Sequence, residues 1–411
     1  MSLNLILVAV SMLAWGLGEG MFFYFQPIYL QQLGADPIKI GAILGAFGLM
    51  MTISHIPAGY LADRLGRKPL MLAAWILGVL ATWIMALANA LPLFVVGLLV
   101  YGATMFVLSP LYSYVTAARG VWSVGRAITL ISASFNVGMI IGPWVGGQIG
   151  ELYGLSQTYF IAAWIFMAST AIIIFIRPQP VEDLDGTDKG DGWLKDSRYQ
   201  RYLIAIFLAT FAMYLPQPLS PNFLENQRHL ALSQIGPLYS LSSIGVVALN
   251  LLLGQLPARI GFLLGQAAVG VFSLSLWLGT GLPWYMVGFF LLGGYKTARS
   301  LSTAQVQQLV PQAKLGLAYG FTETVSSTAM ILAPLLAGYL YAQDPAWIYS
   351  SAVFLILASL GTSTLFSPTH SVPPAHLPEI GTGSPAAQAL RSSHTEDNQA
   401  TRSSKVKENN L

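Results

Sequence analysis

Gly59-Tyr60-Leu61-Ala62-Asp63-Arg64-Leu65-Gly66-Arg67-Lys68 is a short charged turn between two long apolar runs, roughly residues 39–62 and 69–90. It carries three cations and one carboxylate, in a chain of which only 9% of the residues are charged. Its glycines allow two helix ends to approach closely and to turn sharply. Because basic residues mark cytoplasmic loops, the stretch predicts a tight cytoplasmic connection between two membrane-spanning helices.

The composition is that of a polytopic membrane protein. Of the 411 residues, 55% are hydrophobic, which lies outside the soluble globular range. A net charge of +3 is too small to argue for a nucleic-acid partner, and the absence of cysteine excludes disulfides and thiolate metal sites. No lysine follows a glycine, so the chain has no G-x-x-x-x-G-K loop for ATP, and nothing suggests an enzyme.

Counting apolar runs at ~20 residues per span predicts an all-α membrane protein with twelve transmembrane helices. The expected limits are 5–30, 39–62, 69–89, 92–117, 127–149, 158–176, 201–224, 234–256, 262–281, 284–309, 315–341 and 346–366. The first run has no basic segment before it and no small-residue cleavage site after it, so we expect a retained helix. Sixteen of the 20 lysines and arginines fall in even-numbered loops or in the tail, which places both termini in the cytoplasm.

Composition also divides the chain. We expect residues 1–176 and 201–366 to form two six-helix bundles joined by an acidic, Gly/Pro-rich cytoplasmic linker, residues 177–200. Residues 367–411 form a polar cytoplasmic tail that cannot bury a core, and we expect it to be disordered. It holds three irregularly spaced histidines (His370, His376 and His394), for which a solvated tail is favoured over a metal site.

The two halves show a weak internal duplication, as expected for a two-half transporter. An offset of 191 residues relates Leu91-Pro92, Gly97, Gly102, Gly125, Ala127, Pro143 and Gly147 to Leu282-Pro283, Gly288, Gly293, Gly316, Ala318, Pro334 and Gly338. An offset of 195 residues relates Ile40-Gly41 and Gly59 to Ile235-Gly236 and Gly254.

The pattern G-x-L-A-D-R-x-G-R-K-P of the charged turn resembles the loop 2–3 signature of the major facilitator superfamily of secondary transporters. The resemblance covers residues 5–366 and implies two pseudo-symmetric bundles around a central cavity. It also implies a conformational latch, in which Asp63 acts at the cytoplasmic contact between the halves, near the N-terminus of helix eleven. The latch residues are Gly59, Asp63, Arg64, Gly66, Arg67 and Lys68. The second copy of the turn has Ala258 and Phe262 in place of Asp63 and Arg67, so the second half lacks the same latch.

Helix five carries a second pattern, G-x-x-x-G-P-x-x-G-G, formed by Gly138, Gly142, Pro143, Gly146 and Gly147. It looks like the helix-five motif of proton-coupled exporters in this superfamily; ordinary small-residue packing is the alternative reading. One feature departs from such exporters, which usually carry an arginine in helix four, four residues before a glycine. Here Leu98 occupies that place before Gly102.

Polar residues within the spans are the candidates for substrate and proton binding. Pro216, Pro218 and Pro221 must break helix seven, and broken backbone is tolerated only against protein or a water-filled cavity. Gln217 and Asn222 beside them, and Gln26 on helix one, are therefore candidate cavity residues.

Four charges lie inside spans and form the predicted coupling and binding constellation: Glu19, Lys296, Arg299 and Glu323. Lys296 and Arg299 are three residues apart and share a helix face. Glu323 lies at a depth similar to that of Arg299 and could pair with it. Glu19 would then be the freer carboxyl, and burial would favour its neutral form, so that it could carry a proton. The alternative is that all four charges merely hold helices together.

We expect a proton-coupled exporter of a small, mostly apolar organic compound that works by alternating access, as a monomer in the lipid bilayer of the cell membrane. Its partners would be the substrate and protons, with no nucleic acid, no cofactor and no metal. One alternative is proton-coupled uptake of a metabolite such as a sugar or an organic acid. Another is a membrane sensor or scaffold that transports nothing.

Overall fold

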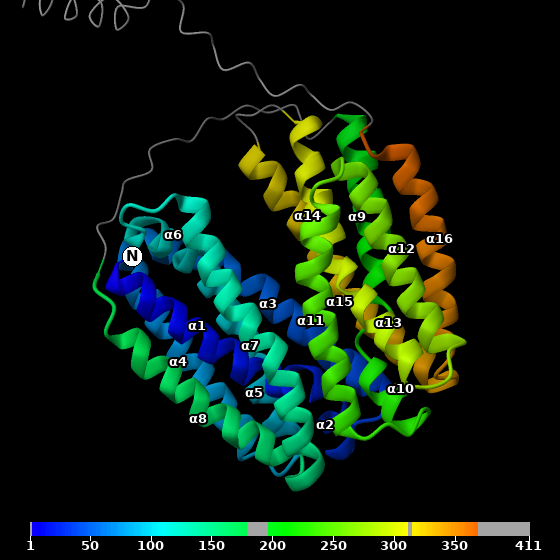
Figure 1. Ribbon diagram of the computed structural model, residues 1–411, viewed down its shortest axis with the longest axis horizontal. Helices are drawn as coiled ribbons and strands as arrows, with labels where there is room; N and C mark the ends of the chain where they lie inside the picture. Colours follow the sequence, from blue (N-terminus) through cyan, green and yellow to red (C-terminus); the bar gives the residue numbers. More distant parts are fainter. Residues whose placement is uncertain (1, 179–195, 311–314, 369–411) are drawn as a thin grey trace, which may run out of the picture. The chain divides into compact units, whose positions relative to one another are not determined.

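The computed structural model describes residues 2–178, 196–310 and 315–368, without the side chains of residues 55–65, 109, 316 and 317. Most of the predicted linker (177–200) and nearly all of the predicted tail (367–411), with its three histidines, lie outside the described residues. The next helix begins at Ser197, so the linker ends four residues earlier than predicted. Within the described ranges the regular structure is helical. Figure 1 shows the first half of the chain as one group of helices, with the second half beside it.

The first half contains the six expected spans. In chain order they are α1 (Leu3–Phe22) with η1 (Phe23–Phe25) and α2 (Gln26–Gln32), α3 (Pro37–Leu65), α4 (Arg67–Ala86), α5 (Leu91–Ala103) with η2 (Thr104–Val107) and α6 (Leu108–Ala118), α7 (Val124–Tyr153) and α8 (Leu155–Ile174).

The second half also follows the expected order. It contains α9 (Ser197–Tyr214) with α10 (Ser220–Asn226), α11 (Leu232–Leu253), α12 (Ala258–Trp277), α13 (Leu282–Leu292) with α14 (Gly294–Gln305) and η4 (Val306–Gln308), α15 (Leu315–Gln343) and α16 (Trp347–Phe366).

Ten helical stretches of the described chain are long and apolar enough to cross a membrane, and the two remaining spans are interrupted helices. Helix seven breaks between α9 and α10, where the prolines that predicted the break remove amide donors. Helix ten breaks at Gly293, between α13 and α14, which the sequence had not led us to expect. With these two, the all-α fold of twelve transmembrane helices is confirmed.

An aromatic cluster holds α1 against α4 and α8 in the first half. The ring of Trp15 lies 5.0 Å from that of Trp75 and 4.3 Å from that of Phe166. The indole nitrogen of Trp75 donates to the hydroxyls of Ser11, at 2.9 Å, and Ser169, at 3.0 Å. Because three helices share these contacts, α1 is a rigid support for the residues at its far end, Glu19 among them.

The halves meet at two helix crossings, α3/α15 and α7/α11, which are related to each other by the internal duplication. On α3, a Cβ added to Gly41 would overlap the carbonyl oxygen of Pro334 and lie 3.1 Å from the Cα of Gly338. The backbones therefore approach as closely as only glycine permits.

The α7/α11 crossing repeats this geometry. A Cβ added to Gly236 would overlap the carbonyl oxygen of Pro143 and lie 3.3 Å from the Cα of Gly147. These three residues are the ones that the offsets of 195 and 191 residues relate to Gly41, Pro334 and Gly338. The duplication read from the sequence is therefore a structural one.

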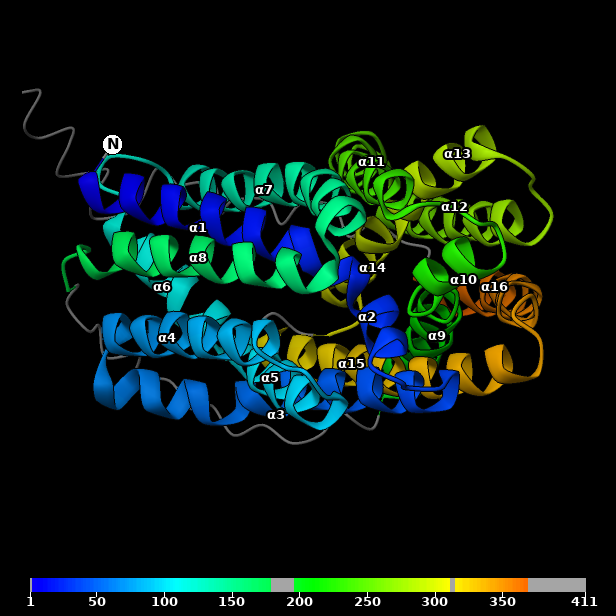
Figure 2. The ribbon, with the colours of Figure 1, turned by 90° about the horizontal axis from the view of Figure 1, so that it is seen from below.

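Between the two crossings lie α2 and α10 (Figure 2). The side-chain amide of Asn222 donates to the backbone carbonyl of Pro27 at 3.1 Å and to the side-chain oxygen Oε1 of Gln31 at 2.7 Å. Gln31 and Asn226 exchange hydrogen bonds of 2.9 and 3.2 Å. Because Pro27 and Asn222, like Gln31 and Asn226, are 195 residues apart, a pseudo-two-fold axis passes between α2 and α10. We call this side, at the far end of α1 from the N-terminus, the closed end.

Candidate functional site

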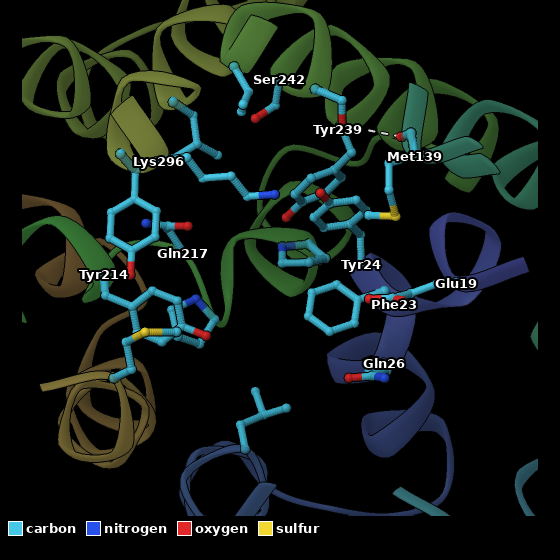
Figure 3. A pocket seen from close by; sticks show the side chains of 18 of the residues that line it. Glu19, Phe23, Tyr24, Gln26, Met139, Tyr214, Gln217, Tyr239, Ser242 and Lys296 are labelled. Carbon is cyan, nitrogen blue, oxygen red and sulfur yellow. Dashed lines mark hydrogen bonds between the residues drawn. The ribbon is translucent and has the colours of Figure 1, made fainter. Parts of the chain in front are cut away.

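A cavity of about 450 Å³ lies between the halves and is lined by both of them. The volume is that of a site for a drug-sized molecule. Figure 3 shows the cavity walls. The lining residues used below are Glu19, Phe23, Tyr24, Gln26, Leu44, Phe47 and Met139 from the first half, and Tyr214, Gln217, Pro221, Tyr239, Ser242, Ser243, Lys296, Arg299 and Met330 from the second.

Aromatic rings enclose much of the space. The rings of Tyr24 and Tyr239, from opposite halves, stack with centroids 4.1 Å apart. The hydroxyl of Tyr239 is hydrogen-bonded to that of Ser220 at 2.8 Å, which fixes its ring. These contacts join the halves on the same side as the amide contacts of α2 and α10, so the cavity is shut toward the closed end.

Glu19 enters the cavity from the last turn of α1, where the helix passes into the tight turn of η1. Only 8% of its surface is exposed. The indole nitrogen of Trp15, one helical turn earlier, donates to its Oε2 at 3.1 Å. The buried hydroxyl of Tyr101 faces the same carboxyl. Glu19 is the one carboxyl among the residues that line the cavity.

Lys296 reaches into the cavity from the opposite wall. It follows the break at Gly293, in the first turn of α14, and its side chain extends toward the rings of Tyr24 and Tyr239 (Figure 3). The residue is exposed to the cavity. Within the described residues two ion pairs occur, Lys39–Asp36 and Arg299–Glu323, and Lys296 belongs to neither.

Arg299 and Glu323 are brought together as the predicted pair. A guanidinium nitrogen of Arg299 donates to Oε2 of Glu323, and another contacts the sulfur of Met330 at 3.2 Å. Arg299 lines the cavity, whereas Glu323 stands behind it and is half exposed. The pair cancels its own charge.

The three predicted polar residues separate. Gln26 and Gln217 line the cavity, and the side chain of Gln217 donates to the carbonyl of Met213 at 2.8 Å. Asn222 instead lies at the closed end, where it joins α10 to α2.

The helix-five glycines form a packing surface with two faces. A Cβ on Gly138 would lie 2.5 Å from the carbonyl oxygen of Leu13, and one on Gly142 would lie 2.7 Å from the Cα of Gly20. Gly146 faces α1 in the same way, at Met21, whereas Gly147 faces α11. The motif thus joins α7 both to α1 and to the other half; a role in export remains a prediction.

Half of the six predicted latch residues lie outside the described side chains. Gly66, with φ of 81°, separates α3 from α4, and Arg67 and Lys68 begin α4. Gly59, Asp63 and Arg64 fall in the part of α3 whose side chains are not described, so the role of Asp63 stays a prediction.

Comparisons with known proteins agree with this architecture. The sequence profile of the Major Facilitator Superfamily matches residues 6–294 and 202–398. The chain belongs to the Major Facilitator Superfamily. It is therefore a multi-pass membrane transporter for small molecules and not an enzyme.

Relatives in this superfamily include two resistance proteins. Multidrug resistance protein 2 of Bacillus subtilis (strain 168) is 23% identical over 369 residues, 85% of this chain and 92% of that protein. Tetracycline resistance protein, class B, of Escherichia coli is 24% identical over 389 residues, 86% of this chain and 93% of that protein. A crystal structure of a mutant nucleoside transporter NupG has a TM-score of 0.78 at 14% identity, covering 89% of this chain and 100% of that chain, which shows the fold alone.

Several lining residues of this major facilitator cavity escaped the sequence analysis, and the duplication could have found them. Adding the offset of 195 to Glu19 gives Tyr214, and adding it to Gln26 gives Pro221. Both of the residues found in this way, Tyr214 and Pro221, line the cavity. Three further lining pairs related by the two offsets are Leu44 and Tyr239, Phe47 and Ser242, and Met139 and Met330.

Proposed function

We propose that the chain exports a small, mostly apolar organic compound by proton-coupled alternating access. The observation that carries the proposal is an aromatic cavity at the pseudo-symmetric junction of two bundles, with a buried carboxyl on one wall and an amine on the other. Secondary transporters bind their substrates and coupling ions at the interface between their repeats. The names of the relatives, multidrug and tetracycline resistance proteins, support export.

The proposed orientation places both termini in the cytoplasm of a cell. The closed end then faces outward, and the described conformation is shut toward the outside. The native chain has no cysteine, so single cysteines at positions 39 and 400 can be labelled selectively. We expect position 39 to be modified by an impermeant reagent from outside and position 400 from inside; the opposite pattern would reverse the orientation.

Glu19 is the proposed proton carrier. It is nearly buried, faces the cavity, and keeps a neutral donor, the indole of Trp15, as its hydrogen-bond partner. A carboxyl in such surroundings can gain and lose a proton as water access alternates between the two sides.

Flux into inverted membrane vesicles, with and without a pH gradient, tests the proposal. Gradient-driven accumulation of an apolar aromatic compound inside the vesicles is expected, because inverted vesicles turn export into uptake. Transport only in the opposite direction would favour uptake of a metabolite. The observation that supports this second candidate is the amine of Lys296 in the cavity, which could bind an organic acid. No flux of any compound would favour a sensor or scaffold.

A further inference from the structure

We propose that the cavity selects aromatic compounds that carry one acidic group, and that Lys296 is the residue that binds this group. The inference rests on the proposed transport function and names the chemical class of its substrate.

The charge of the cavity wall is unevenly placed. Arg299 is neutralised by Glu323, so the pair offers no net charge to a ligand. Glu19 also lines the cavity, but it is only 8% exposed and its Oε2 accepts a hydrogen bond from the indole of Trp15. Lys296, in contrast, is exposed, and within the described residues no carboxylate lies within ion-pair distance of it. A ligand at the centre of the cavity therefore meets the ammonium group first.

The position of Lys296 suits recognition rather than helix packing. An intramembrane lysine that only held helices together would be expected to contact a carboxylate or backbone carbonyls. Its side chain instead extends into open space, toward the stacked rings of Tyr24 and Tyr239 (Figure 3). The break at Gly293 lies three residues before Lys296, so the amine is carried by the first turn of the new helix α14.

The rings define the rest of the ligand. Phe23, Tyr24, Tyr214 and Tyr239 line the cavity around the amine. Such rings favour offset or edge-on contact with another aromatic ring. A permanent cation would find these faces attractive but would be repelled by Lys296 in the same space. An aromatic body with a carboxylate satisfies both the rings and the amine.

Three probes that share one ring system separate the contribution of ligand charge from that of the aromatic body. They are 1-naphthoate, 1-naphthamide and 1-naphthyltrimethylammonium, which carry charges of −1, 0 and +1. Binding to the purified full chain in detergent is measured by calorimetry, with no gradient present. We expect naphthoate to bind at least about tenfold more tightly than naphthamide, since hydrogen bonds to charged groups contribute that much or more, and the ammonium probe to bind most weakly.

The matched variants are Lys296→Met, which keeps the length and removes the charge, and Lys296→Arg, which keeps the charge. Lys39→Met is the control, since Lys39 is an exposed cation paired with Asp36 outside the cavity. Lys296→Met should bring the naphthoate-to-naphthamide ratio close to one, whereas Lys296→Arg and Lys39→Met should retain the preference. Size-exclusion profiles and thermal midpoints show whether each variant is folded, and Lys296→Arg carries the test if Lys296→Met is not.

Three results would overturn the inference: a wild-type preference for the amide or the ammonium probe, a naphthoate preference that survives in Lys296→Met, or no binding of any probe. The proposed export can fail separately. Anion preference in detergent without gradient-driven export would leave the substrate class standing and remove the direction. Export of neutral or cationic compounds alone would do the reverse.

Discussion

The two halves of this transporter share their close-packed glycines but not their polar groups. At the α3/α15 and α7/α11 crossings, Gly41 and Gly236 meet the partner backbone in the same way. On the cavity walls, however, the offset of 195 places Tyr214 in the second half where Glu19 stands in the first. The offset of 191 places the apolar Met105 where Lys296 stands in the second half. The backbone contacts shared by the two crossings form a symmetric frame, whereas the charged and polar side chains of the cavity differ between the halves.

The crossings show the same inequality. Across α7/α11, Glu151 accepts from the backbone N–H of Leu232 at 2.9 Å, and the hydroxyl of Ser243 donates to the carbonyl of Met139 at 3.2 Å. Between residues 37–54 of α3 and 330–343 of α15, the described hydrogen bonds include none that crosses. Opening the closed end therefore breaks polar contacts on one side of the axis and only van der Waals contacts on the other.

The largest expected effect comes from the shared part of the frame. Gly41→Leu and Gly236→Leu should each lower the transport rate about 5- to 150-fold, since overpacking costs about 1–3 kcal/mol in the closed state alone. Spin labels at Gln32→Cys and Gln227→Cys, exposed residues on the two sides of the closed end, should move apart in both variants.

Gly361→Leu is the control for this substitution, because a Cβ on Gly361 meets no atom within 4 Å. If either glycine variant kept the wild-type label distance and rate while the other lost them, the two crossings would not be mechanically equivalent.

A second effect tests the unequal chemistry. Glu19→Gln should abolish proton-driven flux yet preserve exchange of substrate between the two sides, because it removes only the proton-binding group. Glu323→Gln should weaken folding or binding as well, by about 1–3 kcal/mol, since it leaves Arg299 without its counter-charge, although partial exposure reduces the loss. Flux in vesicles and thermal midpoints measure the two outcomes. A wild-type pH dependence of flux in Glu19→Gln would remove Glu19 from coupling.

The frame was open to prediction from the sequence because it is periodic. Apolar runs of helical length located all twelve spans, and glycines and prolines at offsets of 191 and 195 anticipated which backbones would touch. The prolines of helix seven predicted its break for the same local reason: they lack the amide donor that a helix needs.

The cavity was less predictable, because membership in it depends on helix rotation and on the break at Gly293, which no proline marks. Glu19, Lys296 and Arg299 could be singled out because charge in a span is costly. Residue type alone does not single out Tyr214 and Tyr239, since a tyrosine in a span is also common as packing or as an interface anchor; only their offset of 195 from Glu19 and Leu44 points to them. Asn222 illustrates the converse: its polarity is used at the closed end and not in the cavity.

A smaller effect concerns the single hydroxyl that crosses α7/α11. Ser243→Ala removes the bond to Met139 and should favour opening of the closed end by about 1 kcal/mol, roughly a fivefold shift in population. Thr52→Ala is the control, because its hydroxyl bonds within α3 to the carbonyl of Gly48, the residue equivalent to Ser243. Label distances between Gln32→Cys and Gln227→Cys are measured for both variants. Equal shifts would show that the Ser243–Met139 hydrogen bond does not stabilise the closed end.

The smallest expected effect is a pH dependence of the closed end. Burial, reinforced by the nearby charge of Glu151, raises the pKa of Glu225, which lies one residue beyond the predicted span 201–224. Opening of this end would expose Glu225 to water and take it away from Glu151, so its pKa is higher in the closed state. Protonation therefore favours closure: the closed population should rise as the pH falls through the raised pKa and should decline above it. Glu225→Gln should abolish this dependence and stay closed at high pH.

Hydrogen bonds from Lys39 hold the pKa of Asp36, at the same end, below its usual value, so Asp36→Asn should leave the dependence unchanged. Label distances between Gln32→Cys and Gln227→Cys, followed from pH 4 to pH 8, decide the matter. A closed population that rises with pH, or one that responds to Asp36→Asn instead, would contradict this role of Glu225.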